Sequence, residues 1–306
     1  MKLDIQDGNI HSPQFNLNKI TIVGMGLIGG SLGMALVANG IGRQVWGVDI
    51  DHDSLEVAAQ IKAGHEFTHD LLTGVDNADL VIIATPVGKT IEILQRIAGK
   101  LKPGCLVTDV GSVKATVVAA AQDILPQQVE FLGGHPMAGS EMAGIRGADA
   151  KLFAQAVYVI TPTENTSVQA LKKLRLVMET LGAQVVVHSP EEHDLLVAGV
   201  SHLPHLVAVA LVNTVRSLAE ENPGALGLAA SGFRDTTRIA GSQSLIWRDI
   251  FLQNREATLT LLNRFKHAVS SLEEVVAAED SGGIELLLEQ ARITRQGISE
   301  KLSQEG

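Results

Sequence analysis

A histidine flanked by glycines is the residue of this sequence best suited to move a proton. His135 lies in the segment GGHPMAGSE (133–141), which follows an apolar run. An imidazole titrates near neutral pH, so it can act as a general acid or base. The glycines permit close approach of a substrate, and Pro136 stiffens the segment. A surface or core histidine is the alternative interpretation, but the context favours His135 as a proton acceptor, with Glu141 in the same expected loop.

Two further segments combine polar residues with an apolar setting. Ser112 lies in DVGSVK (109–114), again just after an expected strand. His202 and His205 lie in an apolar stretch together with Pro204, a combination that is destabilising unless the side chains have partners. No third metal ligand follows at regular spacing, so the sequence predicts no metal site. We expect these histidines to line a substrate site, with structural hydrogen bonding as the alternative.

An arginine near the end of the apolar part is a candidate for binding an acid. Arg238 stands between threonines and an apolar pair, and a guanidinium binds a carboxylate through two parallel hydrogen bonds. Arg234 and Arg248 are expected to pair with the neighbouring Asp235 and Asp249. Arg238 is therefore the predicted carboxylate clamp.

A glycine pattern near the start of the chain indicates a dinucleotide site. Gly24, Gly26 and Gly29 form G-x-G-x-x-G between an expected strand and an expected helix, which is the context that this pattern requires. The first glycine permits a tight turn, the second lets a pyrophosphate approach, and the third lets helix and strand pack closely. Leu27 and Ile28 open the helix, whose free N–H groups would bind the phosphates.

An acidic residue after the second expected strand indicates which dinucleotide binds. Asp49 lies 20 residues after Gly29, where a carboxylate accepts hydrogen bonds from ribose hydroxyls and repels a 2′-phosphate. The sequence therefore predicts NAD rather than NADP. Thr85 and Pro86 end a later strand at the same edge and are expected either to line the cofactor or only to form a turn.

These residues can form one site only if the ends of several strands lie close together, and the pattern of apolar residues predicts such a fold. Strands alternate with helices of about 10–15 residues up to residue 188, which predicts a doubly wound parallel sheet of the Rossmann type. The expected strands are Lys19–Gly24, Gln44–Asp49, Leu80–Ala84, Cys105–Asp109, Val129–Gly133, Val157–Thr161 and Gln184–His188. The expected helices between them are Leu27–Asn39, Ser54–Ala63, Lys89–Lys100, Ser112–Gln122 and Val168–Leu181.

Beyond residue 188 the pattern is helical only, with helices expected at 191–220, 225–231, 243–276 and 280–303. We place a domain boundary here, with a dinucleotide-binding domain at 1–188 and an all-α domain for dimerisation and substrate binding at 189–306. Val197–Val212 is almost wholly apolar, and such a helix is buried, here in a subunit interface. A homodimer is the expected assembly.

The amino-acid composition limits which classes of partner this protein can be expected to bind. The 306 residues carry a net charge of −10, which disfavours nucleic acid and anionic membranes as partners. The single cysteine, Cys105, lies in an apolar run and is expected to be buried. No signal-peptide core is seen in the first 18 residues, and no uninterrupted apolar run approaches the roughly 18 residues of a membrane span. We expect a cytoplasmic protein that does not enter a membrane.

Taken together, the motifs resemble those of the prephenate/arogenate (cyclohexadienyl) dehydrogenase family of tyrosine biosynthesis. The matching segments are GMGLIGGS (24–31), TDVGSVK (108–114), GGHPMAGSE (133–141), SHLPH (201–205), FRDTTRIA (233–240) and WRDIF (247–251). They occur in family order from about residue 19 to 255. The resemblance implies a dinucleotide-binding domain followed by a helical dimerisation domain.

The resemblance also implies a reaction and a role for each matched residue. NAD⁺ takes a hydride from ring C4, the C4 hydroxyl becomes a carbonyl, and CO₂ leaves C1 as the ring becomes aromatic. His135 would bind the hydroxyl and help to remove its proton, and Ser112 would orient it. Arg238 would bind substrate carboxylate, and Glu141 and His202 would lie near the substrate's mouth and side chain.

The product would be 4-hydroxyphenylpyruvate from prephenate or tyrosine from arogenate. Family members that favour prephenate often carry a further histidine about three helical turns after the position of His202, where this chain has Val212-Asn213-Thr214. The preference between the two substrates therefore stays open. Two other classes are compatible with the glycine pattern: another Rossmann-type hydroxyacid dehydrogenase and a noncatalytic NAD-sensing protein.

Overall fold

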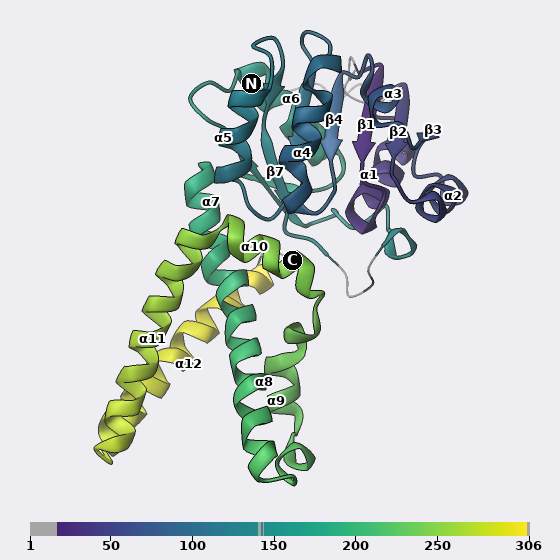
Figure 1. Ribbon diagram of the computed structural model, residues 1–306. Coiled ribbons are helices and arrows are strands. Elements are labelled where there is room, and N and C mark those ends of the chain that lie inside the picture. Colours follow the sequence, from purple (N-terminus) through teal and green to yellow (C-terminus); the bar gives the residue numbers. More distant parts are fainter. Residues whose placement is uncertain (1–16, 140–141, 143, 305–306) are drawn as a thin grey trace, which may run out of the picture. The chain divides into compact units, whose positions relative to one another are not determined.

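The computed structural model describes residues 17–304 apart from 140, 141 and 143 (Figure 1). It divides into two compact units. The first contains the chain up to Thr85, Lys89–Gly111 and Ala120–Val187. The second contains Pro86–Gly88, Ser112–Ala119 and the chain from His188 onward. Two short segments from the first part of the sequence therefore belong to the helical unit.

The first unit is built on a six-stranded parallel sheet with the strand order β3-β2-β1-β4-β5-β6. This is the order of a doubly wound dinucleotide-binding fold, so the predicted fold class is confirmed. The central strands are mostly apolar and almost entirely buried, as expected of strands covered on both faces. The strands are β1 Lys19–Val23, β2 Gln44–Val48, β3 Glu66–Thr68, β4 Leu80–Ile83, β5 Leu106–Asp109 and β6 Glu130–Phe131.

Helices connect these strands, and side-chain caps fix where several of them begin. The Asp51 carboxylate accepts a hydrogen bond from Ser54 N, and Ser167 Oγ accepts one from Ala170 N. The helices are α1 Leu27–Ala38, α2 His52–Gln60, α3 Leu71–Val75, α4 Val87–Ile97, α5 Ala115–Ile124 and α6 Val168–Thr180. Single 3₁₀ turns follow at Ala98–Lys100 and Ile145–Gly147. β3 and α3 were not predicted from the sequence; they are only three and five residues long.

A second, three-stranded sheet corrects the expectation that all strands join one parallel sheet. Its strands are β7 Gly133–Pro136, β8 Val157–Thr161 and β9 Gln184–Val187, and β7 runs antiparallel to β8. The strand predicted at Val129–Gly133 is in fact two strands, β6 and β7, which belong to different sheets. His135 therefore lies within a strand, opposite Val159, and not in a loop as predicted.

The second unit is helical after β9, as the sequence predicts, but two of the expected helices are interrupted. A π-helical turn divides the first, and Asn254 divides the helix expected at 243–276. In Figure 1, α8 and α9 lie side by side, as do α11 and α12. The elements are α7 Pro190–Val197, the π turn Ala198–His202, α8 Leu203–Glu221, 3₁₀ turns Ala225–Leu228 and Arg238–Gly241, α9 Ser231–Thr237, α10 Ser244–Gln253, α11 Arg255–Ala277 and α12 Ser281–Gln304.

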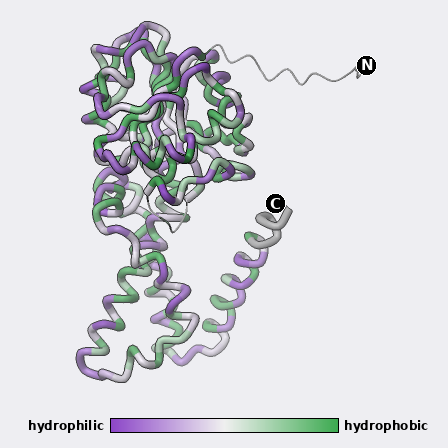
Figure 2. Tube along the Cα trace, turned by 90° about the vertical axis from the view of Figure 1, so that its right-hand side faces the viewer, coloured by the Kyte–Doolittle hydropathy of each residue, from purple (hydrophilic) through white to green (hydrophobic). Residues whose placement is uncertain are grey.

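The long helices of this unit leave many large apolar side chains exposed. Hydrophobic positions recur along these helices in Figure 2, and Leu218, Val276 and Leu288 are among the exposed apolar residues. Within the described residues, Pro190–Glu221 is the one helical stretch that is long and apolar enough to cross a membrane by length and composition alone, a criterion that buried or interface helices of other proteins also meet. The interface helices of dimeric proteins have the same composition.

Gly33 provides a test of the packing between α1 and the turn after α2. A Cβ at this position would collide with the backbone carbonyl oxygen of Ala63. Gly33→Ala should therefore lower the free energy of unfolding by about 1–3 kcal/mol in a urea titration. Gly99→Ala is the matched control, because nothing lies within 4 Å of its Cβ position. Equal stability of the two variants would refute this packing.

Candidate active site

The glycine turn between β1 and α1 has the shape that a dinucleotide pyrophosphate needs. Gly24 has a φ of +100°, which favours glycine, and its N–H donates to the carbonyl of Val48 at 2.7 Å. A Cβ on Gly29 would collide with the carbonyl oxygen of Gly24, so only glycine permits this close approach. A Cβ on Gly26 would meet nothing within 4 Å. The backbone at Gly26 therefore borders open space, which a pyrophosphate could occupy.

The start of α1 is suited to an anion. Gly26 provides no side-chain cap, and the first turn of the helix contains no acidic residue. The N–H groups of Leu27 and Ile28 therefore have no side-chain acceptor among the cap residues, and the helix dipole adds positive potential. These residues fit a pyrophosphate.

Asp49 is held beside this turn by backbone donors. Its Oδ2 accepts from Met25 N at 2.6 Å, and its Oδ1 accepts from Asp51 N at 2.9 Å. The carboxylate follows β2 and is half-buried. Each oxygen keeps a second lone pair, so the group can still accept hydrogen bonds from sugar hydroxyls. Thr85 is also in the first unit, and its buried Oγ1 has no hydrogen-bond partner among the described residues. Pro86 is exposed and belongs to the second unit.

His135 is positioned by backbone pairing of β7. The half-buried His135 lies between Gly134 and Pro136, which pair with Ile160 and Tyr158 of β8. The buried Asp109 carboxylate accepts from Gly134 N at 3.3 Å and from Gly111 N at 3.0 Å. Asp109 therefore ties the end of β5 to the strand that carries the imidazole.

Of the other predicted residues of these segments, Ser112 is half-buried and belongs to the second unit. Glu141 lies outside the described residues.

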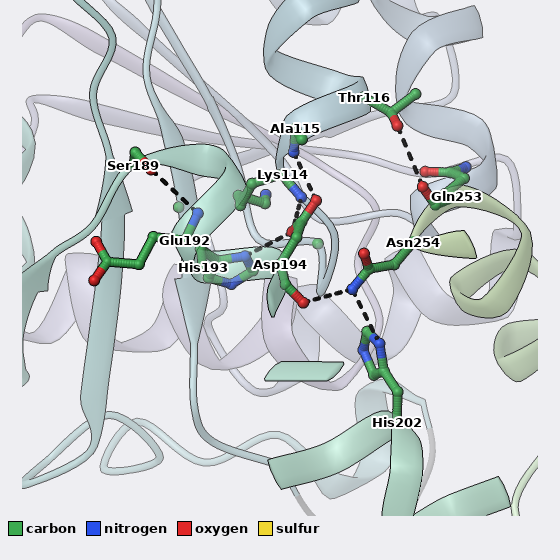
Figure 3. Close-up of polar contacts among 12 residues, drawn as sticks. Lys114, Ala115, Thr116, Ser189, Glu192, His193, Asp194, His202, Gln253 and Asn254 are labelled. Atoms are coloured by element: carbon green, nitrogen blue, oxygen red, sulfur yellow. Dashed lines mark hydrogen bonds and ion pairs between the residues drawn. The ribbon is translucent and has the colours of Figure 1, made fainter. Parts of the chain in front are cut away.

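In the second unit, Asp194 organises a buried polar network (Figure 3). Its carboxylate accepts from Lys114 N at 2.7 Å and from Ala115 N at 2.9 Å, at the start of α5. His193 Nδ1 lies 2.8 Å from the same carboxylate. The side chains of Asp194 and Lys114 are buried. The segment that carries Ser112 is thereby fixed to α7.

The network continues from Asp194 to His202 through Asn254. Asn254 Nδ2 donates to the Asp194 carbonyl at 2.8 Å and lies 3.2 Å from His202 Nδ1 (Figure 3). His202 is 1% exposed, and its Nε2 has no partner among the described residues. Burial lowers the pKa of the His202 imidazole to about 4, although the Asp194 carboxylate acts in the opposite direction. His202 is therefore neutral at neutral pH.

An aromatic cluster surrounds the two histidines of the apolar segment. His205 stacks on Trp247 with ring centroids 3.7 Å apart, and His202 meets Trp247 and Phe251 edge-on. Burial lowers the pKa of the His205 imidazole, and a hydrogen bond with the backbone of Ile239 acts in the opposite direction. Pro204 is accommodated because it lies in the first turn of α8, directly after the π turn. The described residues contain no group of three side chains able to hold a metal ion.

The arginines differ in their surroundings. Arg238 is exposed and opens the 3₁₀ turn after α9. The predicted pairing of Arg248 is confirmed, since its Nε and Nη2 donate to Asp249 Oδ1 at 2.8 and 2.7 Å. Arg234 is exposed on α9.

Asp194 and Asn254 were not predicted from the sequence as site residues. Asp194 follows a histidine in the first turns of an expected helix, where an acidic residue indicates only a solvated face. Asn254 carried a weak signal, because asparagine is a poor helix former in the middle of the helix expected at 243–276. Neither signal identifies the buried network.

Comparison with known proteins agrees with this architecture. The family described as prephenate dehydrogenase, nucleotide-binding domain, matches residues 32–187, and the prephenate dehydrogenase dimerization domain matches residues 189–290. The chain is 36% identical over 280 residues to the prephenate dehydrogenase of Bacillus subtilis, covering 91% of this chain and 76% of the relative.

Two crystal structures are similar to this chain over nearly all of their own length. Prephenate dehydrogenase from Aquifex aeolicus, in complex with hydroxyphenyl propionate and NAD⁺, has a TM-score of 0.87 at 33% identity, covering 93% of this chain and 99% of that one. Synechocystis arogenate dehydrogenase has a TM-score of 0.80 at 34% identity, with 92% and 99% covered.

The Rossmann-type sheet and the helical unit thus define a dehydrogenase with a nucleotide-binding domain. The chain belongs to the prephenate dehydrogenase family.

The lowered pKa of His202 predicts an acid-sensitive stability. The unfolded chain, with a histidine pKa of 6.5, binds a proton that the folded protein takes up only near pH 4. The stability contribution is therefore complete above pH 6.5 and falls by about 3 kcal/mol as the pH drops to 4. Asp194, His193 and His205 are the titratable groups facing His202.

Urea titrations between pH 4 and 7 measure this effect. His202→Gln should show a shallower fall of stability with pH than the unsubstituted protein. The exposed His267→Gln should leave the pH dependence unchanged. A fall that is equally steep in His202→Gln would place the acid sensitivity on other groups.

Proposed function

We propose that this chain catalyses the NAD-dependent oxidative decarboxylation of prephenate, of arogenate, or of both, and so supplies 4-hydroxyphenylpyruvate or tyrosine. The observation that carries the proposal is the similarity, across both units, to a prephenate dehydrogenase crystallised with hydroxyphenyl propionate and NAD⁺. The bound dinucleotide accepts a hydride from ring C4. The C4 hydroxyl becomes a carbonyl, and loss of CO₂ from C1 leaves its electron pair in the ring, which becomes a phenol after O4 regains a proton.

His135 is the proposed base of this reaction. Electron density from the C4 oxygen must expel the hydride, so a hydrogen-bond acceptor that withdraws the hydroxyl proton lowers the barrier. The backbone of β7 and the Asp109 contact to Gly134 fix the position of His135, which limits the reorganisation needed during the step. Ser112 is proposed to orient the same hydroxyl.

Cationic and polar groups bind the rest of the substrate. Arg238 is the proposed partner of the ring carboxylate; it is exposed, and its planar fork matches the geometry of that group. It holds the carboxylate without transferring a proton, because decarboxylation needs the anion. His202 is proposed to contact the side chain of the substrate, and Glu141 to lie near it.

NAD is the proposed cofactor, in preference to NADP. Gly24, Gly26 and Gly29 with the start of α1 hold the pyrophosphate, and the fixed Asp49 carboxylate accepts from the ribose hydroxyls. A 2′-phosphate beside the same carboxylate would be repelled. Thr85 and Pro86 are proposed to line the cofactor.

A homodimer formed by the helical domain, residues 189–306, is the proposed assembly. Its support is the match to a dimerization domain and the exposed apolar side chains of the long helices. These include Leu218 and Val212 on α8, Leu259, Val269, Leu272 and Val276 on α11, and Leu286, Leu288 and Ile293 on α12. The dimer would bury these groups, which explains the apolar composition of Pro190–Glu221.

The direct test of the function offers the purified protein prephenate and then arogenate, each with NAD⁺ and with NADP⁺, and follows reduced dinucleotide. We expect NADH with at least one substrate and slower turnover with NADP⁺. Binding of NAD⁺ by calorimetry without turnover of either substrate would favour a noncatalytic sensing protein and overturn the proposal.

Replacing the proposed base tests the chemical step. His135→Asn should lower kcat by about 10²–10⁴-fold and change KM little, because the lost interaction grows in the transition state. Steady-state kinetics measure both constants, with His267→Asn on the surface of α11 as the control. An unchanged kcat would remove His135 from the mechanism.

Replacing the proposed carboxylate clamp tests ground-state binding. Arg238→Gln should raise KM for the cyclohexadienyl substrate by about 10–100-fold and lower kcat less, because a charged hydrogen bond to bound substrate is lost. Arg234→Gln in the same exposed region is the matched variant. A raised KM in Arg234→Gln alone would transfer the role to Arg234.

A further inference from the structure

Asn254 occupies the junction between α10 and α11, where the chain stops being one continuous helix. Its side chain is buried and reaches two groups from α7 and the π turn. One is the carbonyl oxygen of Asp194, 2.8 Å from Nδ2, and the other is Nδ1 of His202, 3.2 Å from the same atom (Figure 3). A single amide nitrogen therefore bridges a peptide carbonyl and an imidazole.

The peptide carbonyl decides the orientation of the amide. A carbonyl oxygen only accepts hydrogen bonds, so the amide nitrogen and not the amide oxygen must face it. The same NH₂ group has a second hydrogen, which is directed to His202 Nδ1. Because Nδ1 accepts this hydrogen, it carries no proton of its own, and the proton of the neutral ring is at Nε2.

We propose that Asn254 is a positioning residue that fixes the Nε2–H tautomer of His202, and that this N–H donates a hydrogen bond to the side-chain carboxylate of the cyclohexadienyl substrate. The substrate part of the proposal rests on the function proposed above. Prephenate and arogenate both carry this carboxylate, so the contact serves either substrate.

Two observations support a ligand as the partner of Nε2–H. The atom is buried, and no acceptor among the described residues reaches it, an arrangement that is destabilising unless something else binds there. His202 also stays neutral: burial lowers its pKa, and the nearby Asp194 carboxylate already accepts from two backbone N–H groups and contacts His193. His193 and His205 are the other titratable groups beside the ring, and Trp247 and Phe251 of α10 add no charge.

The tautomer can be read without any enzyme assay. A two-bond ¹H–¹⁵N correlation spectrum of the full-length protein distinguishes protonated from unprotonated ring nitrogens, and His202→Gln assigns the signal by its loss. We expect Nδ1 of His202 to be unprotonated and Nε2 to carry the proton between pH 6 and 8 (about 2 units above the shifted pKa and higher). Nδ1–H in the dominant form would overturn the proposal.

Substitutions of Asn254 test its positioning role. In Asn254→Asp an oxygen faces Nδ1 and accepts from it, so the ring proton moves to Nδ1 or the ring becomes an imidazolium. We expect KM to rise about tenfold with a smaller change in kcat, and kcat/KM to gain an ionisation between pH 5 and 7. Thr258→Val, a buried isosteric change on α11, is the control and should leave tautomer and pH profile unchanged. An unchanged KM and pH profile in Asn254→Asp would refute the role.

Two substitutions of His202 keep the proposal testable if Asn254→Asp does not fold. The amide nitrogen of glutamine can take the place of Nε2, whereas the shorter asparagine reaches only the place of Nδ1. His202→Gln should therefore keep KM within about threefold, and His202→Asn should raise it about tenfold. Equal KM values in the two variants would contradict donation from Nε2. Absence of turnover in the unsubstituted protein would instead refute the proposed function and leave the tautomer measurement valid.

Discussion

The second unit depends on the hydrogen bonds that the buried Asp194 carboxylate accepts from the start of α5. An isolated charge in a protein interior is strongly destabilising, and here backbone donors of Lys114 and Ala115 and the ring of His193 offset this penalty. The two backbone groups are at the start of α5, where a negative charge also interacts favourably with the helix dipole. One side chain thus caps a helix that lies about 80 residues away in the sequence.

Asp194 positions two other segments of the second unit, one through its carboxylate and one through its backbone carbonyl. Toward α5, it holds the segment Ser112–Ala119 in the helical unit, although the flanking sequence belongs to the first unit. Toward α11, the carbonyl of Asp194 orients the Asn254 amide, which in turn contacts His202. Ser112 and His202, two proposed substrate contacts, are therefore positioned from the same residue.

The sequence predicted what depends on local pattern. The glycine turn, the alternation of strands and helices and the helical second part all follow from spacing and periodicity, which act over a few residues. The partners of β7 could not be predicted in this way, because an antiparallel pairing of Gly133–Pro136 with Val157–Thr161 joins segments about 25 residues apart and leaves no local signal. His135 was therefore predicted as a candidate base from its residue type and its neighbours, but it was expected in a loop. The short elements β3 and α3 were missed because too few residues carry their pattern.

Buried polar residues on helices were the hardest to predict. Asp194 and Asn254 are polar residues on or between helices, and such residues are usually expected to face solvent. Only tertiary packing places them in the interior. The structure thus adds a relay from Asp194 through Asn254 to His202. Neutron diffraction from deuterium-exchanged crystals tests this relay most directly, since it locates protons. We expect a deuteron on Nε2 of His202, none on Nδ1, and the Asn254 amide nitrogen facing both Nδ1 and the Asp194 carbonyl. A deuteron on Nδ1 with the amide oxygen turned toward it would refute the proposed role of Asn254.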